Sequence, residues 1–344
     1  MLPINELKTL MKTVVNANRS NPVAYSFNNE NFSYKELDET LRQELNLLAG
    51  TSASYRENKN TIFTLMEEVV SEVTPKKVAD RFMAFAETKV FPQGSKPVFT
   101  RKMGKMRAKQ FITRVGLAGV YEVFKLGGTS FEVETSALGG AAQIGFEEYL
   151  DGRVDFNELV QVIVDGIEEA VYQEVAAALT SSIEQLPEAN RVSTNGFDEV
   201  AMDRLIQIGS AYGNPAIYCT REFAVKMIPQ EAWASSEMKN TLWTTGYLPT
   251  YKGVPVIILE QSYTDETNAT KTIDPGYAYI MPTGGEKPVV IAIEGTTHMR
   301  EVENHDWSRD IHAYQKVGVA VRLTNNICIY TDTDLAGKLD TIGA

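Results

Sequence analysis

A long helical pattern between residues 155 and 185 limits the folds open to this chain. Its apolar side chains recur at intervals of three and four residues, at Phe156, Leu159, Val160, Ile163, Ile167, Ala170, Val171, Ala178, Leu179 and Ile183. Asp155 with Glu158 is an acidic version of the capping box that begins many helices, and Pro187 stops the pattern. At 1.5 Å per residue, roughly 30 residues form a rod about 45 Å long. Acidic residues occupy the opposite face, so we predict an amphipathic spine helix, which an enzyme core rarely needs.

The preceding residues, 94–145, have the pattern of a β-ribbon and not of a compact core. Short β-type runs such as Phe111–Thr113 and Tyr121–Phe124 lead to Phe131–Glu134, which alternates with a period of two. Glycines interrupt these runs, at positions 94, 104, 116, 119, 127, 128, 139, 140 and 145. So many glycines favour a long, bending hairpin. Such a ribbon is marginally stable alone, and we expect it to lie on another surface.

Residues 1–93 are predicted to form a polar N-terminal arm that carries short helices. One helical pattern covers Tyr34–Leu48, with leucines on a single face. A second pattern covers residues 61–88 and is expected to break at Pro75, because proline removes a backbone donor and clashes with the preceding turn. Few aliphatic clusters occur in the first sixty residues, so we expect the arm to be extended.

The remaining chain alternates between short helices and strands. Helices are expected at Asp198–Ala211 and Arg221–Ile228. Strands are expected at Ala216–Cys219, Pro255–Leu259, Tyr277–Met281, Val289–Glu294, Thr297–Val302, Val317–Thr324 and Ile327–Tyr330. No segment repeats at the periods of solenoids or propellers. This order of elements predicts an α+β fold.

Composition narrows the classes of function. The chain has 344 residues, a formal net charge of −12 and a pI near 4.9, so as a whole it does not attract polyanions. Its longest aliphatic run, about Val254–Leu259, is far shorter than the ~20 residues that span a bilayer, and its N-terminus lacks a secretion signal. The two cysteines, Cys219 and Cys328, fit a reducing compartment and are predicted to be small buried hydrophobes.

A search for catalytic motifs is negative. The sequence contains no phosphate-binding loop, no dinucleotide-binding glycine motif, no zinc-protease motif, no C-x-x-C and no G-x-S-x-G. The glycine cluster at Leu138–Gly145 lacks the spacing of a dinucleotide turn and the lysine of a phosphate loop. We therefore predict no catalytic residues, no cofactor and no metal ligands.

The histidines leave one alternative open. All three, His298, His305 and His312, fall at seven-residue steps. On a helix this step would place them on one face, which is the arrangement of a metal-dependent enzyme. The flanking residues have an extended pattern, however, and along a strand an odd step turns neighbouring histidines to opposite faces. We therefore favour polar residues on strands and a connecting loop, and keep a metal-dependent enzyme as the alternative.

The charge pattern is more informative than any motif. Residues 96–125 contain eight basic residues and one acidic residue, a net charge of +7, whereas residues 130–174 contain eleven acidic residues and one basic residue, a net charge of −10. We interpret this as self-complementarity, in which the ribbon of one copy lies across the acidic spine region of the next. The candidate interface residues are Arg101, Lys102, Lys105, Arg107, Lys109, Arg114, Glu147, Glu148, Asp151, Asp165, Glu168 and Glu169.

A nucleic-acid-binding hairpin is the alternative interpretation of the basic segment. Lysine and arginine at this density would attract phosphates. Only Phe99 and Phe111 are available there for stacking on bases, and the acidic chain opposes capture. We therefore prefer a contact between subunits.

The order of these elements resembles the major capsid proteins of tailed bacteriophages, which share the Hong Kong 97-type fold. The likeness covers about residues 90–332. It is carried by the spine helix at Asp155–Glu184, by Pro215–Arg221, Gly253–Ile258 and Pro275–Ile280, and by the closing strands within His298–Asp332. The likeness lies in the order and type of the predicted elements and not in a short sequence motif.

The resemblance implies a structural protein whose copies form pentamers and hexamers of an icosahedral shell around double-stranded DNA. Residues 1–93 would be the N-terminal arm and 94–145 the extended β-loop. Residues 146–195 and 296–344 would form the peripheral domain, and 196–295 the axial domain. A bacterial encapsulin-type compartment shell, which shares the fold but encloses enzymes, is the alternative.

The resemblance also implies partners and a location. Because the chain starts at Met1, we expect no removed leader and a separate scaffolding protein. A portal, decoration or minor capsid proteins and weak, non-specific contact with packaged DNA are further expectations, with no membrane partner. The shell would be assembled in the host cytoplasm and would form the capsid of the virion.

Overall fold

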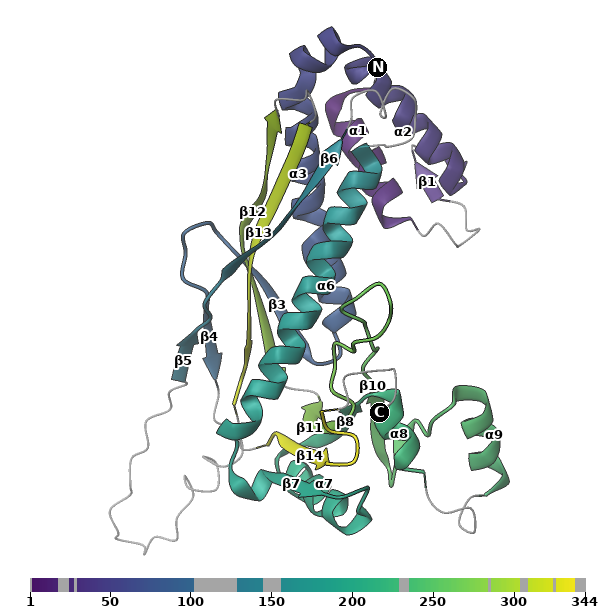
Figure 1. The fold of residues 1–344 in the computed structure, drawn as a ribbon, viewed down its shortest axis with the longest axis vertical. Helices are drawn as coiled ribbons and strands as arrows, with labels where there is room; N and C mark the ends of the chain where they lie inside the picture. The colour runs from purple at the N-terminus through teal and green to yellow at the C-terminus, as the bar shows by residue number, and fades with distance from the viewer. Residues whose placement is uncertain are drawn as a thin grey trace, which may run out of the picture.

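A computed structural model describes residues 2–17, 25–27, 30–101, 129–144, 156–228, 235–283, 286–303, 309–323 and 326–337. Figure 1 shows an elongated molecule, with long helices and a long sheet in the upper part and a second sheet with short helices at the lower end. Helices and mixed sheets alternate along the chain, so the α+β class is confirmed.

The N-terminal segment forms a helical layer. Its elements are α1 (Ile4–Asn16), β1 (Tyr25–Phe27), β2 (Glu30–Phe32), α2 (Tyr34–Ala49) and α3 (Ser52–Phe82). A capping box begins α2, because the Glu36 carboxylate accepts from the backbone N–H of Ser33 while the Ser33 hydroxyl accepts from that of Glu36. Thr51 and Ser54 cap α3 in the same way. Local side-chain bonds therefore decide where both helices begin.

The helices of the N-terminal segment differ from those of the predicted arm, in which all helices were expected to be short. α3 is 31 residues long, and Leu10, Leu41 and Val70, one from each helix, are fully buried within the same chain. They belong to the hydrophobic cluster that also contains the core of the spine helix. The polar composition was misleading because α1 and α2 each bury only a narrow apolar stripe and keep their other faces polar.

Pro75 does not interrupt α3, contrary to the prediction. Proline removes one intrahelical hydrogen bond. Here the residues on both sides are held by packing, since Val73, Thr74 and Val78 are buried against the rest of the chain. Tertiary burial supplies most of the stability of helices in proteins, and it outweighs the lost bond.

The predicted spine helix is confirmed as α6 (Phe156–Ser182). A 3-10 turn at Ile183–Gln185 follows it, and Pro187 comes directly after Leu186. Asp155 of the expected cap lies outside the described residues. α6 packs on α3 on one side and on the long sheet on the other (Figure 1). With 27 residues it spans about 40 Å.

The long sheet has the strand order β3-β12-β13-β6. Its strands are β3 (Ala86–Phe91), β12 (Val289–Glu303), β13 (Arg309–Val321) and β6 (Ser136–Ile144). β12 runs parallel to β3 and antiparallel to β13, which pairs antiparallel with β6. The two strands expected at 289–294 and 297–302 are one strand with a register shift between Glu294 and His298. Gly295 and Thr296 mark a bulge and not a turn.

The first half of β12 is buried on both faces. Val289, Ile291 and Ile293 belong to the cluster beneath the helices, whereas Val290 and Ala292 belong to a second cluster on the opposite face. Because side chains alternate along a strand, two layers cover the sheet here. This double burial explains the uninterrupted apolar run in the sequence.

The second layer is the base of the predicted ribbon. β4 (Val98–Arg101) pairs antiparallel with β5 (Thr129–Glu132). Phe99 is 1% exposed, and its ring lies 5.6 Å from that of Phe91 and 6.2 Å from that of Phe131, measured between centroids. The base therefore lies on the sheet of its own chain. Residues 102–128 of the ribbon are outside the described part.

The lower sheet has the strand order β7-β14-β11-β8-β10-β9. Its strands are β7 (Arg191–Thr194), β14 (Cys328–Asp332), β11 (Tyr277–Thr283), β8 (Asn214–Cys219), β10 (Val254–Ile258) and β9 (Thr250–Tyr251). The surrounding helices are α7 (Glu199–Tyr212), α8 (Arg221–Lys226) and α9 (Ser236–Thr245), with a 3-10 turn at Glu188–Asn190. Met202, Leu205, Phe223 and Tyr330 lie in its own hydrophobic cluster.

Sheet membership differs from the division of the chain made on sequence. β7 and β14 were assigned to the peripheral region, yet they form one end of the lower sheet. The start of β12 was assigned to the axial region, yet it pairs with β3 in the long sheet. Pairing between strands far apart in sequence leaves no local signal, so the sequence could not show which sheet these strands join.

No helix in the described part of the chain combines the length and the hydrophobicity needed to cross a bilayer.

The two adjacent glycines of β6 should respond differently to substitution. A Cβ at Gly139 would lie 2.6 Å from the carbonyl oxygen of Ala313 and 2.8 Å from Cβ of Tyr314, whereas a Cβ at Gly140 would meet nothing within 4 Å. We expect Gly139→Ala to lower the free energy of unfolding by about 1–3 kcal/mol through overpacking. Gly140→Ala, the matched control, should be neutral or slightly stabilising. Thermal denaturation of both variants measures this, and equal losses would contradict it.

Candidate assembly surfaces

The predicted acidic residues on α6 face basic residues of the same chain. Lys77 Nζ lies 3.0 Å from Asp165, and Arg81 Nη1 lies 2.9 Å from Glu168 and 3.5 Å from Glu169. Both basic residues belong to α3. These ion pairs hold the two long helices together, so the structure assigns Glu168 and Glu169 first to a contact within the subunit.

Arg81 is the centre of this joint. Its guanidinium lies 4.5 Å from the centre of the Tyr172 ring, a cation–π contact. The Tyr172 hydroxyl donates to the carbonyl of Glu260, and the Ser262 hydroxyl donates to Glu169. Burial raises the pKa of Tyr172, so its hydroxyl remains a donor. α3, α6 and the loop after β10 are therefore tied at one point.

Lys77 and Arg81 were not among the predicted residues, because the prediction paired the acidic residues of the spine helix with the basic segment at 96–125. A local signal exists, however. Lys77 and Arg81 are four residues apart, and Asp165 and Glu168 are three apart, so each pair lies on one helical face. Two long helices with matching charge spacing indicate an ion-paired helix contact.

Most other candidates lie outside the described residues. They are Lys102, Lys105, Arg107, Lys109, Arg114, Glu147, Glu148 and Asp151. Arg101 ends β4, where its backbone pairs with Thr129. Asp165 combines its bond to Lys77 with a side chain that is 56% exposed. The structure thus brings three of the acidic candidates together on α6 and describes no contact between them and the basic segment.

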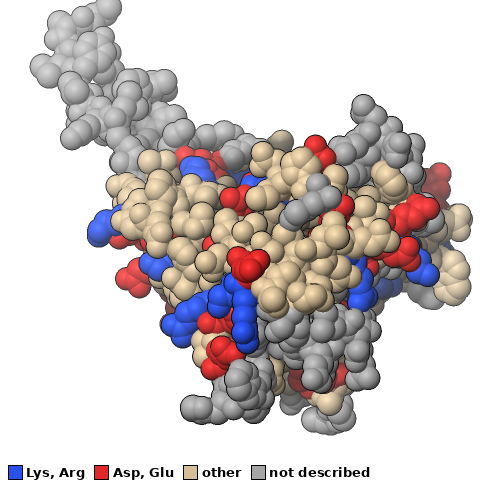
Figure 2. All heavy atoms as spheres, turned by 90° about the horizontal axis from the view of Figure 1, so that it is seen from above, with Lys and Arg blue, Asp and Glu red and all other residues tan. Residues whose placement is uncertain are grey.

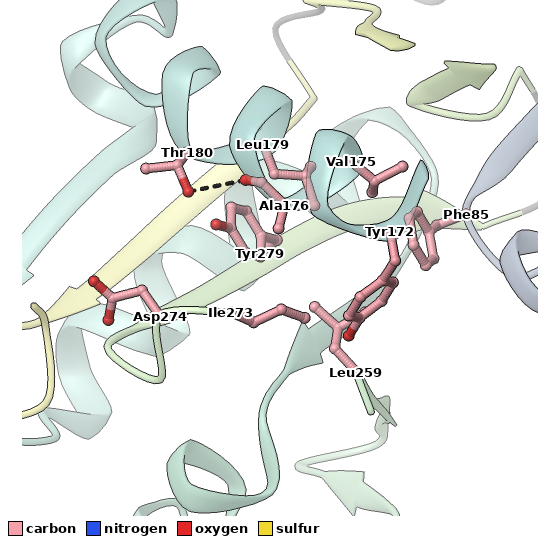
Figure 3. Close-up of a pocket in the computed structure, with 10 residues that line it drawn as sticks. All are labelled: Phe85, Tyr172, Val175, Ala176, Leu179, Thr180, Leu259, Ile273, Asp274 and Tyr279. Carbon is pink, nitrogen blue, oxygen red and sulfur yellow. Dashed lines mark hydrogen bonds between the residues drawn. The ribbon is translucent and has the colours of Figure 1, made fainter. Parts of the chain in front are cut away.

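A small hollow lies where α6 meets the lower sheet (Figure 3). It is lined by Phe85, Tyr172, Val175, Ala176, Leu179, Thr180, Leu259, Ile273, Asp274 and Tyr279. It holds little more than a water molecule, and its walls are mainly aliphatic and aromatic side chains. The Thr180 hydroxyl is turned back to the carbonyl of Ala176, and burial raises the pKa of Tyr279. The hollow is a packing junction and lacks the size of a substrate site.

Two of the three histidines lie on the long sheet. His298 on β12 is opposite Tyr314, and His312 on β13 is opposite Arg300. The His298 ring lies 5.3 Å from the Tyr314 ring. Among the residues that the structure describes, no group of three or more side chains is arranged to hold a metal ion. His305 is outside that part, so the metal alternative stays an untested hypothesis.

The two cysteines are buried in the lower sheet, as predicted. Cys219 on β8 and Cys328 on β14 flank the same strand, β11. Burial raises the pKa of each thiol to about 12. A thiol is a nucleophile only as the thiolate, so neither cysteine is reactive at neutral pH.

α9 presents an exposed aromatic side chain. It is capped by the Ser235 hydroxyl at its start and by Gly246 in the left-handed conformation at its end. It contains no buried residue, and Trp243 is 94% exposed. In Figure 1 α9 projects from the lower part beyond α8. Large exposed aromatic residues are typical of interaction surfaces.

The opposite end of the molecule shows mixed charge. Figure 2 shows this end from above, with basic and acidic side chains interspersed over the described surface. Lys8 and Lys12 of α1 form ion pairs with Glu72 of α3. Hydrogen bonds from Lys12 and then Lys8 lower the pKa of Glu72 to about 2. Ion pairs between α1 and α3 thus also neutralise charges within the subunit.

Comparison with known families gives one match, over residues 6–330. The family is described as "SPbeta prophage-derived putative capsid protein YonB". A search of curated proteins found no match. The family match covers the helical layer, both sheets and the spine helix.

Solved structures share the fold. A phage-related protein from Bordetella bronchiseptica has a TM-score of 0.50 at 12% identity, over 79% of this chain and 97% of that one. The capsid of a native GTA particle has a TM-score of 0.50 at 15% identity, over 74% and 90%. The SrpI encapsulin from Synechococcus elongatus has a TM-score of 0.44 at 12% identity, over 78% and 92%, a level that decides nothing between the two kinds of shell.

The expected Hong Kong 97-type capsid fold is confirmed by the order of the elements and by the two neighbours with a TM-score of 0.50. With a family match over nearly the whole chain, this protein belongs to the YonB family of prophage-derived capsid proteins and is a structural shell protein.

Proposed function

We propose that copies of this chain assemble as pentamers and hexamers into a closed icosahedral shell around double-stranded DNA. The family match over residues 6–330 carries this proposal. The net charge of −12 supports it, because an acidic shell holds DNA without binding it tightly. Trp243 on the projecting helix α9 supports contact between copies.

The finer division of labour keeps the domains predicted from the sequence. Residues 94–145 would reach across a neighbour as the extended β-loop. Residues 196–295, which contribute four strands of the lower sheet, would point towards the five-fold and six-fold axes. Residues 146–195 and 296–344 would form the peripheral domain, and residues 1–93 would reach neighbours from the helical layer that they form.

Several partners belong to this proposal. They are a scaffolding protein during assembly, a portal at one vertex, and decoration or minor capsid proteins on the finished shell. Assembly would take place in the host cytoplasm, and the product would be the capsid of the virion. Contact with packaged DNA would be weak and non-specific.

An encapsulin-type compartment shell is the second candidate. It uses the same fold but encloses enzymes, so the contents of the particle distinguish the two. The prophage origin in the description of the matching family favours the viral shell.

The basic ribbon remains the proposed contact with the next copy. Arg101, Lys102, Lys105, Arg107, Lys109 and Arg114 would supply the positive side. Glu168 and Glu169 already pair with Arg81 within the subunit, so the proposed negative side narrows to Glu147, Glu148 and Asp151 with the exposed Asp165. Complementary charge of this kind fixes register more than it adds affinity.

The shell itself can be tested by microscopy of the purified full-length chain. We expect closed particles tens of nanometres across, roughly the diameter that many copies of one domain enclose. Nuclease-protected double-stranded DNA in particles from an infected or induced host would favour the viral shell, and an enclosed enzyme would favour the compartment. A chain that stays monomeric at every concentration and ionic strength would contradict the proposal.

Charge reversal tests the ribbon contact. We expect Lys105→Glu with Arg107→Glu to reduce the yield of closed shells by about tenfold while leaving a folded chain, because like charges would then face each other. Reversal of Glu147 and Glu148 to Lys in the same chain should restore part of the yield. Normal shells from the basic-site variant alone would contradict the contact. Loss of a salt-dependent affinity for duplex DNA in that variant would instead favour the nucleic-acid hairpin.

Trp243 allows a test of the projecting helix. Because its side chain is 94% exposed, Trp243→Ala should change the melting temperature of the unassembled chain by little. We expect the same substitution to weaken assembly, because aromatic residues dominate the binding energy of interfaces. The measurement is the protein concentration at which shells form. An unchanged concentration would exclude Trp243 from the contact.

A further inference from the structure

One buried carboxylate joins both ends of the ribbon to the long sheet. Glu294 lies on β12 directly before the bulge and is 6% exposed. Its Oε1 accepts from the backbone N–H of Gly94 at 2.9 Å and lies 3.4 Å from Lys316 Nζ on β13. Its Oε2 accepts from the Thr135 hydroxyl at 2.6 Å. Three segments that are far apart in sequence therefore meet at one side chain.

The two ribbon contacts lie on either side of the hairpin. Gly94 precedes β4, and Thr135 follows β5. The chain therefore leaves the sheet at Gly94 and returns to it at Thr135, and residues 102–128 begin and end at the hairpin between them. We name this arrangement the Glu294 clasp, made of Glu294, Gly94, Thr135 and Lys316.

The backbone around the clasp leaves little freedom. Gly94 and Gly295 have φ values of +78° and +70°, a conformation that favours glycine. A Cβ on Gly295 would lie 3.2 Å from Cβ of Gln93, so the bulge of β12 fits closely against the turn that begins the ribbon. The bulge therefore helps to place the Glu294 carboxylate beside this turn, where it accepts from Gly94.

A second close approach fixes the returning end. A Cβ on Gly318 of β13 would collide with the carbonyl oxygen of Glu134 and approach Val133 to 3.1 Å. Gly318 thus lets the returning strand cross directly over β13, next to Thr135. The outgoing and returning ends of the ribbon are held by separate contacts that converge on the same part of the sheet.

The charge of Glu294 strengthens these bonds. Hydrogen bonds from Thr135 and Gly94 hold the pKa of Glu294 below its ordinary value, so it is ionised at neutral pH. Hydrogen bonds to an ionised acceptor are shorter and stronger than neutral ones. Its charged neighbour, Lys316, lies on the sheet and not on the ribbon. The carboxylate therefore links ribbon to sheet with directional bonds, whereas an apolar contact would hold it without direction.

We propose that Glu294 is the positioning residue of the ribbon, which sets the direction in which the ribbon leaves one subunit towards the next. This inference rests on the proposed function, in which the ribbon of one copy contacts a neighbour. A ring or shell closes only if each contact repeats the same rotation. The Glu294 clasp therefore acts on the size and closure of the shell, and its effect on the stability of the subunit is secondary.

The test compares variants of the full-length chain. Glu294→Gln keeps the shape and removes the charge, and Thr135→Val removes only the hydroxyl donor. Thr135→Ser restores that donor and serves as the conservative rescue. Glu301→Gln is the matched control, because Glu301 lies on the same strand and binds Tyr55 and Lys59 of α3.

Two readouts separate positioning from simple stability. In the unassembled subunit, amide hydrogen exchange at Gly94 should accelerate by about tenfold in Glu294→Gln, since this amide loses a charged acceptor. Thr135→Val should accelerate exchange at 129–135. In assembled samples, both variants should give open or variably sized particles at a melting temperature within a few degrees of wild type. Thr135→Ser and Glu301→Gln should give wild-type particles.

The outcomes are distinguishable. If wild type and Glu294→Gln give the same closed particles in the same yield, the clasp does not position the ribbon and the inference is overturned, while the proposed function stands. If Glu301→Gln disturbs particle size as much as Glu294→Gln, general loss of stability explains the effect and the inference is again overturned. If wild type forms no particles, the proposed function fails, and exchange at Gly94 then reports only whether Glu294 holds the ribbon base.

Discussion

Burial of β12 on both of its faces holds the upper part of this molecule together. One face packs under α3 and α6, and the other packs under Phe99 and the ribbon base. The strand thus joins a layer made from the first ninety residues, the spine helix and the ribbon into one body, although their sequences are up to two hundred residues apart.

The periodicity of the sequence was sufficient for the spine helix and for several short elements. α6 was predicted within a few residues of its observed bounds because its apolar stripe repeats over seven turns' worth of chain and a proline follows. α8 and the strands β8, β10 and β11 were likewise predicted from short apolar runs between turn residues. β12 was predicted as two strands because the bulge at Gly295 resembles a turn in the sequence.

Long-range pairing accounts for what could not be predicted. β7 and β14 join the lower sheet from regions assigned elsewhere, and the charges on α6 pair with Lys77 and Arg81 of α3. Of the candidate contact residues on α6, Glu168 and Glu169 pair with Arg81 of the same chain, whereas Asp165 pairs with Lys77 and keeps an exposed side chain. Pro75 is a further example, because tertiary packing keeps α3 intact where the local sequence predicts a break.

The burial of both thiols has a practical consequence for following this protein in solution. With Cys219 and Cys328 enclosed in the lower sheet, the native chain has no readily alkylated sulfur. A single cysteine in place of Glu237, an exposed residue of α9, would then be the one accessible attachment point for a fluorophore and would leave Trp243 in place. The label would sit on the projecting helix, and energy transfer between labelled chains would report in real time how neighbouring copies approach one another.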